Sequence, residues 1–290
     1  YAAGDTLLNE AEGVVNQEGA RRISFANGRA QNFYGAGERA HRLRLNGDTL
    51  VMFNRQNYGY GAGDPRISQM GITMPWFASD NGYGVLVDDY ARARLFLGAD
   101  SIVYTSETRK PLSYFFVNGG DLENVTANYT LLTGRQSLPP FWALGYITSR
   151  YGYHNEQEAL GAIDSLRREG YPVDGIVFDL YWYGKETDMG RLEWNRQQFP
   201  DPRRMLDSLN NMGVHTVLIN QPYINKAGAI DNYSMLTEAG LLTHDSVGNP
   251  HDVTTWVGEA GMFDMSNPRT REWLWNRLSG LTAEGVSGWW

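Results

Sequence analysis

The chain has 290 residues, of which 42% are hydrophobic, so it can bury one large core or two smaller ones. Its formal net charge of −8 disfavours nucleic acid or an anionic membrane surface as a partner. It contains no cysteine, which excludes disulfide bonds, thiolate metal ligands and thiol catalysis. The sequence has no run of about eighteen apolar residues, so no membrane span is predicted.

The first part of the chain, to about Leu138, is predicted to be all-β. Short apolar segments alternate with turn signals at the spacing of a β-sandwich; the clearest are Ile23–Phe25, Tyr83–Val87 and Leu112–Val117. Asp80-Asn81-Gly82 is a strong hairpin signal. Tyr34–Glu38 is predicted to be a turn between strands rather than a phosphate-binding nest. A short helix is predicted over 122–132.

After the linker Leu138-Pro139-Pro140, strands and helices alternate. The predicted strands are 143–148, 173–178, 214–219 and 286–290, and the predicted helices are 156–169, 202–212, 233–239 and 270–283. A polar excursion through residue 262 separates the third helix from the fourth. Four β/α units in this length indicate a parallel sheet covered by helices.

These elements predict an α/β plus all-β fold in two domains. Residues 1–138 would form an N-terminal β-sandwich, and residues 139–290 the first four β/α units of a (β/α)8 TIM barrel, which needs roughly 250 residues when complete. A doubly wound open sheet is the alternative, although the chain has no phosphate loop for a nucleotide. Because the last strand would be an unpaired aromatic edge, we expect the chain to be an N-terminal fragment with a truncated barrel.

Asp179 is the first candidate site residue, because it follows the apolar strand Ile176-Val177-Phe178 directly. Function in β/α barrels lies at the carboxyl ends of the strands. The other interpretation is a carboxylate that caps a loop. The first strand likewise ends near Tyr151, the third is followed by Gln221–Ile224, and the fourth ends at Trp290. Trp256 lies in the excursion before the fourth helix.

Together these positions place aromatic and polar side chains at one face. Tyrosine and tryptophan are also abundant, at 17 and 9 residues. Both are amphipathic, which suits either a packed core or a cleft for a sugar ring, and composition alone favours the core. With a carboxylate beside them, the pattern favours a cleft for a polyhydroxylated, ring-shaped ligand.

The sequence predicts neither a metal site nor a cofactor. His154 and Glu158 are four residues apart at a helix start, but no third ligand is near them in the sequence. The remaining histidines, at 41, 215, 244 and 251, have no metal-binding spacing.

Five segments give the chain a resemblance to glycoside hydrolase family 31, whose members cleave or transfer α-linked glucose and related sugars. The segments are Tyr34–Glu38, Leu138–Gly145, Ser149–Tyr153, Asp174–Asp179 and Phe263–Pro268. Within the family, Asp179–Lys185 and Gly285–Trp290 are most similar to oligosaccharide 4-α-glucosyltransferases. The resemblance implies that Asp179 binds hydroxyls of the −1 glucose and that Tyr151, Ile224, Trp256 and Trp290 line the subsite.

The resemblance also implies that no catalytic residue lies in this chain. The nucleophile, an aspartate, is expected just after Trp290 and the acid/base further on, so the fragment alone is predicted to be inactive. The implied enzyme is a retaining α-glucosidase or 4-α-glucosyltransferase on α-glucan oligosaccharides, working through a covalent glycosyl-aspartate. An α-xylosidase and a non-catalytic carbohydrate-binding module are the alternatives. Gln221 replaces an acidic residue found in many relatives. The resemblance and the absence of an initiator methionine predict a secreted or periplasmic protein.

Overall fold

The computed structural model describes residues 6–17, 19–27, 31–39, 41–54 and 72–290 of the chain. The chain divides into two compact units, Tyr1–Ser137 and Leu138–Trp290. The division falls one residue before the boundary placed from the sequence. Each unit has its own hydrophobic core and is described by itself. Within the described part of the chain, no helix combines the length and the apolar composition that crossing a bilayer requires.

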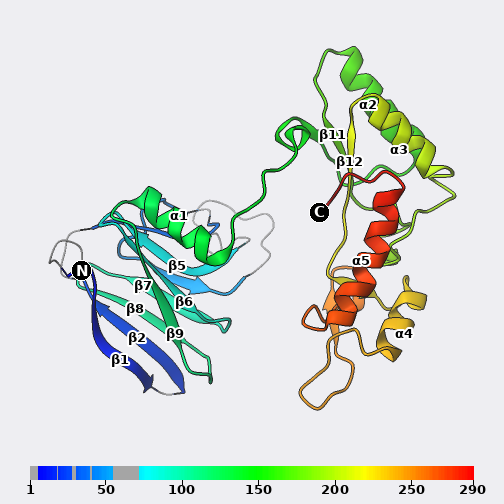
Figure 1. The fold of residues 1–290 in the computed structure, drawn as a ribbon. Helices are drawn as coiled ribbons and strands as arrows, with labels where there is room; N and C mark the ends of the chain where they lie inside the picture. The colour runs from blue at the N-terminus through cyan, green and yellow to red at the C-terminus, as the bar shows by residue number, and fades with distance from the viewer. Residues whose placement is uncertain (1–5, 18, 28–30, 40, 55–71) are drawn as a thin grey trace. The chain divides into compact units, whose positions relative to one another are not determined.

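The first unit is a sandwich of two antiparallel sheets (Figure 1). One sheet has the order β1-β2-β8-β7-β4 and the other the order β3-β5-β6-β9. The strands are β1 (Asn9–Gln17), β2 (Ala20–Ala26), β3 (Phe33–Gly37), β4 (Thr49–Met52), β5 (Thr73–Ser79), β6 (Tyr83–Asp88), β7 (Ala93–Leu97), β8 (Ser101–Ser106) and β9 (Ser113–Asn118). The predicted β-sandwich is therefore confirmed.

One core joins the two sheets, because every second side chain of a strand points inward. In β7, buried and exposed residues alternate without exception. Ile23 and Leu95 of one sheet share the core with Phe33, Phe77 and Tyr83 of the other. The helix α1 (Leu122–Thr133) packs Val125 against Trp76 and Val117 on the outer face of the second sheet. Its N-cap, Asp121, accepts a hydrogen bond from the Asn124 backbone N–H at 2.8 Å.

The sequence predictions for this unit differ from the structure in two places. The hairpin at Asp80-Asn81-Gly82 is confirmed, since β5 and β6 pair from Ser79 to Tyr83 across it. Tyr34–Glu38 is not a turn, because its first four residues belong to strand β3. Gly35 and Gly37 have positive φ there and the pairing with β5 shifts register, so the glycines mark a β-bulge. Strand β1, which is polar and largely exposed, was not predicted.

The second unit contains a parallel sheet whose strands follow sequence order, β10-β11-β12-β16. The elements are β10 (Ile147–Thr148), α2 (Glu156–Arg168), β11 (Gly175–Phe178), α3 (Pro202–Asn211), β12 (His215–Leu218), α4 (Ile230–Glu238), α5 (Pro268–Ala283) and β16 (Gly288–Trp289). A doubly wound sheet reverses its strand order at a switch point, and this sheet has no reversal. The order is that of a partial TIM barrel. Figure 1 shows α2 and α3 side by side along β11 and β12.

Local signals in the sequence set these helices. Asn155 caps α2 by accepting from the Glu158 backbone N–H, and Asp201 caps α3 by accepting from that of Arg204. Pro202 occupies the first turn of α3, where its missing N–H leaves no hydrogen bond unmade. The apolar face of α3, which includes Leu206 and Leu209, packs into the same core as the strands of the sheet.

Two predictions for the second unit are wrong in detail. The first predicted strand begins as a 3-10 helix, η2 (Phe141–Leu144), which leaves only Ile147 and Thr148 in β10. The helix α4 starts at Ile230, three residues earlier than predicted. The excursion contains a three-stranded antiparallel sheet, β13 (Tyr223–Asn225), β15 (Gly258–Met262) and β14 (Asp252–Thr255), in that order. Its strands have only three to five residues, too few for hydrophobic alternation to reveal them.

The amino-terminal edge of the parallel sheet is closed by side-chain packing. The Trp142 indole from η2 stacks on the His215 imidazole, with ring centroids 4.6 Å apart. His215 Nδ1 also lies 3.2 Å from the Ser287 hydroxyl, just before β16. On the other side, the Asp174 carboxylate accepts a hydrogen bond from the Tyr146 backbone N–H at 2.9 Å. Contacts between loops therefore hold this edge, and the side chains of His215 and Asp174 form hydrogen bonds within it.

Candidate functional site

The carboxyl edge of the parallel sheet brings together the ends of β11, β12 and β16. Phe178 pairs with Leu218, and Leu218 pairs with Trp289. The Trp290 N–H donates to the Leu218 carbonyl at 2.9 Å, and the Trp290 carbonyl accepts from the Asn220 N–H at 2.8 Å. The residues that follow these strands, Asp179 on β11 and Trp290 on β16, consequently lie on the same edge with the end of β12 between them.

Asp179 is a partly buried carboxylate directly after a fully buried strand. Burial raises the pKa of its carboxyl above the ordinary value, and a hydrogen bond from the Leu180 backbone N–H opposes that rise. No described lysine or arginine forms an ion pair with it. A carboxylate with this little compensation for lost water has lone pairs to offer to a ligand that donates hydrogen bonds.

Two tyrosines lie close enough to Asp179 for its charge to affect their pKa values. Tyr151 follows β10 and Tyr181 follows β11, and their rings meet edge to face with centroids 6.3 Å apart. Both hydroxyls donate to the same oxygen, Oε1 of Glu186, at 3.2 Å from Tyr151 and 2.8 Å from Tyr181. We call these three residues the tyrosine bridge.

The electrostatics of the tyrosine bridge follow from the Glu186 carboxylate and from the nearby carboxylate of Asp179. The hydrogen bond to Glu186 and partial desolvation raise the pKa of Tyr181 to about 12, with a further contribution from the charge of Asp179. Partial desolvation, the bond to Glu186 and the same charges raise the pKa of Tyr151. Burial, with Asp179 adding to it, also raises the pKa of Tyr183. All three phenols therefore keep their protons throughout the physiological range.

The backbone around the bridge is in an uncommon conformation. Tyr181 has a φ of 74°, a left-handed conformation that non-glycine residues rarely adopt. Gly152, beside Tyr151, has a φ of 143°, and a Cβ added there would lie 2.4 Å from Cδ2 of the Tyr181 ring. Glycine at 152 is what lets the two loops approach this closely.

The other predicted site residues differ in their placement. Trp290 is 69% exposed at the strand edge, and Tyr151 is 60% exposed. Trp256 is 57% exposed, but it lies in the β14–β15 hairpin of the small antiparallel sheet. Ile224 in β13 is completely buried in a hydrophobic cluster with Leu192 and Phe263, so it supports that sheet and presents no surface to a ligand in this structure.

Glu186 was missed by the sequence analysis. It lies in the 3-10 helix η3 (Glu186–Asp188), after the loop that follows β11. Its partner Tyr151 is 35 residues away in the sequence, and no periodicity links the two positions. Tyr181, by contrast, belongs to the aromatic run after Asp179 and could have been chosen on that ground.

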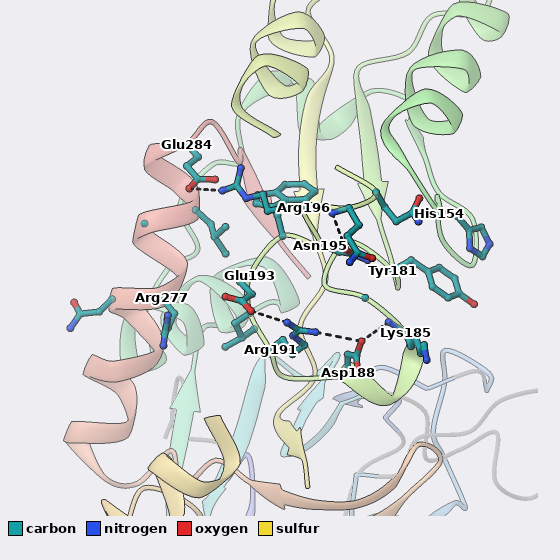
Figure 2. A pocket seen from close by; sticks show the side chains of 18 residues that line it. His154, Tyr181, Lys185, Asp188, Arg191, Glu193, Asn195, Arg196, Arg277 and Glu284 are labelled. Atoms are coloured by element: carbon teal, nitrogen blue, oxygen red, sulfur yellow. Dashed lines mark hydrogen bonds and ion pairs between the residues drawn. The ribbon is translucent and has the colours of Figure 1, made fainter. Parts of the chain in front are cut away.

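A hollow of about 980 Å³ lies between the loop 184–198 and α5 (Figure 2). Arg191 pairs there with Asp188 at 3.8 Å and with Glu193 at 3.1 Å, while Arg196 lies 3.9 Å from Glu284. Tyr181 borders this hollow, but Asp179 does not. Because its charged walls are mostly paired with one another, we assign the candidate site to the sheet edge and not to this hollow.

The structure also shows how the histidine–glutamate pair at the start of α2 is used. Glu158 accepts a hydrogen bond from the His154 backbone N–H at 2.8 Å and forms an ion pair with Arg150 at 2.8 Å. The His154 ring stacks on Tyr181, with centroids 4.1 Å apart. No group of three or more histidine, aspartate or glutamate side chains among the described residues is arranged to hold a metal ion.

Comparison with known proteins gives this sandwich and β/α array a class. Residues 136–290 match the model of the glycosyl hydrolases family 31 TIM-barrel domain, and residues 5–95 match the glycosyl hydrolase 31 N-terminal galactose mutarotase-like domain. The fold is thus that of a barrel glycosyl hydrolase. The chain belongs to glycosyl hydrolase family 31.

Individual relatives agree in fold and differ in name. The chain is 29% identical to alpha-xylosidase XylQ of Lactiplantibacillus pentosus, covering 91% of this chain and 34% of that protein. It is 27% identical to alpha-glucosidase 2 of Bacillus thermoamyloliquefaciens, covering 90% and 33%. A GH31 dextranase of Flavobacterium johnsoniae, solved with glucose, matches with a TM-score of 0.88 at 25% identity, covering 96% and 34%. The chain spans about a third of the length of the curated relatives it matches.

Proposed function

We propose that the protein carrying this chain cleaves or transfers α-linked glucosyl units with net retention, and that this chain supplies sugar-recognition residues. The carrying observation is Asp179, a partly buried carboxylate without an ion-pair partner among the described residues, at the carboxyl edge of the sheet. A carboxylate accepts hydrogen bonds from two hydroxyls of one sugar, and those bonds replace the water it has lost.

The neighbours of Asp179 suit the same ligand. Trp290 and Tyr151 are exposed aromatic side chains on this edge, and a pyranose ring presents apolar C–H faces to such rings. The family membership supports a chemistry in which one carboxylate attacks the anomeric carbon and a second protonates the leaving oxygen. We propose that both of these groups lie outside the 290 residues, the nucleophile just after Trp290.

The proposed sugar is glucose, and the proposed acceptor is water or a glucan hydroxyl. Relatives named as alpha-xylosidase and as alpha-glucosidase match at similar identity, and the two sugars differ by the hydroxymethyl group on C5. Water as acceptor gives hydrolysis, whereas a glucan hydroxyl gives transfer. We propose the α-glucoside, with 4-α-glucosyl transfer or hydrolysis on α-glucan oligosaccharides, on the likeness of 179–185 and 285–290 to 4-α-glucosyltransferases. A secreted or periplasmic location stays a prediction of the sequence.

The test uses the protein that carries this chain and the chain alone. The anomeric proton signals of the first product, followed by NMR with maltotriose, should show the α-anomer before mutarotation. Matched maltotriose and xylose-terminated substrates then separate glucosidase from xylosidase. We expect the 290-residue chain alone to bind glucose but to show no turnover. Turnover by the chain alone would contradict the proposed place of the nucleophile.

A second function, carbohydrate binding by the sandwich, is favoured by a hollow of about 480 Å³ in the first unit. Its described lining includes Phe53, Asp88 and Tyr90, whose ring is 97% exposed. The Arg92 guanidinium lies over the Phe53 ring at 5.5 Å. Calorimetry with maltooligosaccharides decides between the units. Loss of affinity in Tyr90→Ala, with affinity kept in Asp179→Asn, would favour a binding module.

A further inference from the structure

The tyrosine bridge has a chemical consequence for what the strand edge can bind. We propose that Glu186 is a positioning and specificity-determining residue, which takes the hydroxyl protons of Tyr151 and Tyr181 so that these two phenols and the Asp179 carboxylate offer a ligand hydrogen-bond acceptors only. This inference rests on the proposed function, because it concerns the ligand of the same edge. It selects neutral polyhydroxylated sugars and rejects sugars that carry a carboxylate or another anionic group there.

The first step is the geometry of the bridge. One carboxylate oxygen accepts from two phenols, Tyr181 at 2.8 Å and Tyr151 at 3.2 Å, although the phenols come from the loops after two different strands. A hydrogen bond to an ionised acceptor is stronger than one between neutral groups. Glu186 therefore ties the loop after β10 to the loop after β11, which begins at Asp179.

The second step is what holds Glu186 in place. It opens η3, where the Asp188 carboxylate accepts from the Lys185 backbone N–H at 2.9 Å and the Asp188 N–H donates to the Lys185 carbonyl at 2.9 Å. Gly184 has a φ of 133°, and a Cβ there would lie 2.2 Å from an Asp188 carboxylate oxygen. This backbone turn fixes the position of Glu186 independently of its tyrosine partners.

The third step is to count the hydrogen-bond donors and acceptors that these side chains offer to a ligand. A phenol has one proton to donate and lone pairs to accept with. Since Tyr151 and Tyr181 give their protons to Glu186, their oxygens can only accept from a ligand, and the Asp179 carboxylate also only accepts. Each sugar hydroxyl brings one donor, so a neutral sugar satisfies all three groups. An anionic substituent brings acceptors alone and meets two carboxylates at close range, which is an element of selection against it.

Few positively charged side chains lie near the tyrosine bridge, and one of them already forms an ion pair. The Arg150 guanidinium is paired with Glu158 at 2.8 Å and lies over the Tyr153 ring. The Lys185 side chain is exposed in the loop that leads into η3, and Figure 2 shows it beside Asp188 at the hollow. His154 contacts Tyr181 by stacking its ring on the phenol face. The charge at Asp179 and Glu186 is therefore predominantly negative.

The test is Glu186→Gln in the full chain, with Glu193→Gln as the matched control on the same loop. Glu193 pairs with Arg191 and does not touch either tyrosine. Tyrosines labelled with ¹³C at Cζ report their own hydrogen bonds by NMR near pH 7, and Tyr151→Phe and Tyr181→Phe assign the two signals. We expect Glu186→Gln to move both signals and Glu193→Gln to move neither.

Binding is measured by calorimetry with glucose and with glucuronate as the anionic probe. We expect wild type to bind glucose well above glucuronate. Glu186→Gln should weaken glucose binding about three- to tenfold, because an amide oxygen accepts from the two phenols more weakly than a carboxylate and holds them less firmly. It should also raise the glucuronate-to-glucose affinity ratio by about tenfold, because it removes one negative charge. Tyr181→Phe keeps the Glu186 charge, so it should weaken glucose without raising the ratio.

The outcomes separate this inference from the proposed function. If wild type binds glucose and Glu186→Gln keeps both tyrosine signals and the wild-type ratio, the role of Glu186 is overturned while the proposed function stands. If wild type binds no neutral sugar, the proposed function fails and the specificity role fails with it; moved tyrosine signals would then still establish the positioning role.

Discussion

Two aspartates in the same place relative to a strand have opposite surroundings in the two units. Asp80 follows β5 of the sandwich, and Asp179 follows β11 of the parallel sheet. The Asp80 carboxylate accepts from the Asn32 backbone N–H at 2.8 Å and from the Asn32 side-chain amide at 2.6 Å. The Asp179 carboxylate accepts a hydrogen bond from the backbone N–H of the next residue, Leu180, and burial raises its pKa.

The difference follows from how each strand is connected. An antiparallel hairpin turns back within three residues, and here the Gly82 N–H donates to the Ser79 carbonyl to close it. The Asp80 carboxylate then lies next to Asn32, before β3, and accepts both of its hydrogen bonds from that residue. A parallel strand must cross to its neighbour through a helix, and residues 179–201 of this chain lie between strand and helix. The same residue type is structural where the turn uses it and is available for a ligand where a long loop leaves it open.

The largest expected effect tests whether the two units have independent cores. Phe178→Ala should lower the unfolding free energy of the second unit by about 3–5 kcal/mol, because Phe178 is fully buried beside Trp194 and Phe199. Phe33→Ala is the matched change in the sandwich. Urea unfolding followed by circular dichroism should show one transition moved by each variant. A single transition that both variants move equally would show that the cores are coupled.

Asp179→Asn should weaken glucose binding by about ten- to a hundredfold, the effect of losing charged hydrogen bonds of roughly 1.5–3 kcal/mol. The same change should raise the unfolding free energy at pH 7, because it removes a partly desolvated charge. The pKa of Asp179 is raised on folding, so the cost of its charge is present above that pKa. At about pH 3 and below, Asp179 is mostly protonated in both states and the stabilisation of the variant should vanish. Thermal unfolding from pH 3 to 8 checks this, and a pH-independent difference would contradict it.

Asp80→Ala is the counterpart in the sandwich. It removes two hydrogen bonds to Asn32 and should lower stability by about 1 kcal/mol, since the pair is exposed. Glucose affinity should stay at the wild-type value in calorimetry. An affinity loss like that of Asp179→Asn would remove the distinction between the two aspartates.

Arg204→Met should have the smallest effect. Arg204 of α3 forms an ion pair with Glu156 of α2 at 2.6 Å, but the Arg204 side chain is exposed. Such pairs contribute between about 0 and 1 kcal/mol, and salt screens them. Unfolding in 0.05 and 1 M NaCl should show a difference only at low salt. If Arg204→Met lowered the unfolding free energy by more than about 2 kcal/mol, the ion pair would contribute more to the packing of α2 on α3 than an exposed pair should.

Much of this could be predicted from the sequence where a pattern is local. A pattern of only a few residues predicts each of three features: the strand before Asp179, the hairpin at residues 80–82 and the capped helices. Glu186 could not be predicted, because its two partners are joined by folding and not by spacing. Ile224 shows the opposite case: the family resemblance places it at a ligand, and the packing of β13 buries its side chain. The sheet of β13, β14 and β15 could not be predicted, because strands of three to five residues are too short to show an alternating pattern.

Because Trp142 stacks on His215 at the amino-terminal edge of the parallel sheet, the two edges of the sheet should differ in which substitutions they tolerate. One end is sealed by rings and by Asp174, far along each strand from Asp179 and the tyrosine bridge. Sequence changes there would alter how firmly the strands are held without entering the ligand's surroundings. A directed-evolution library could therefore vary residues 149–151 and 180–186 for a new sugar, while changes at the sealed end restore whatever stability the new loops cost.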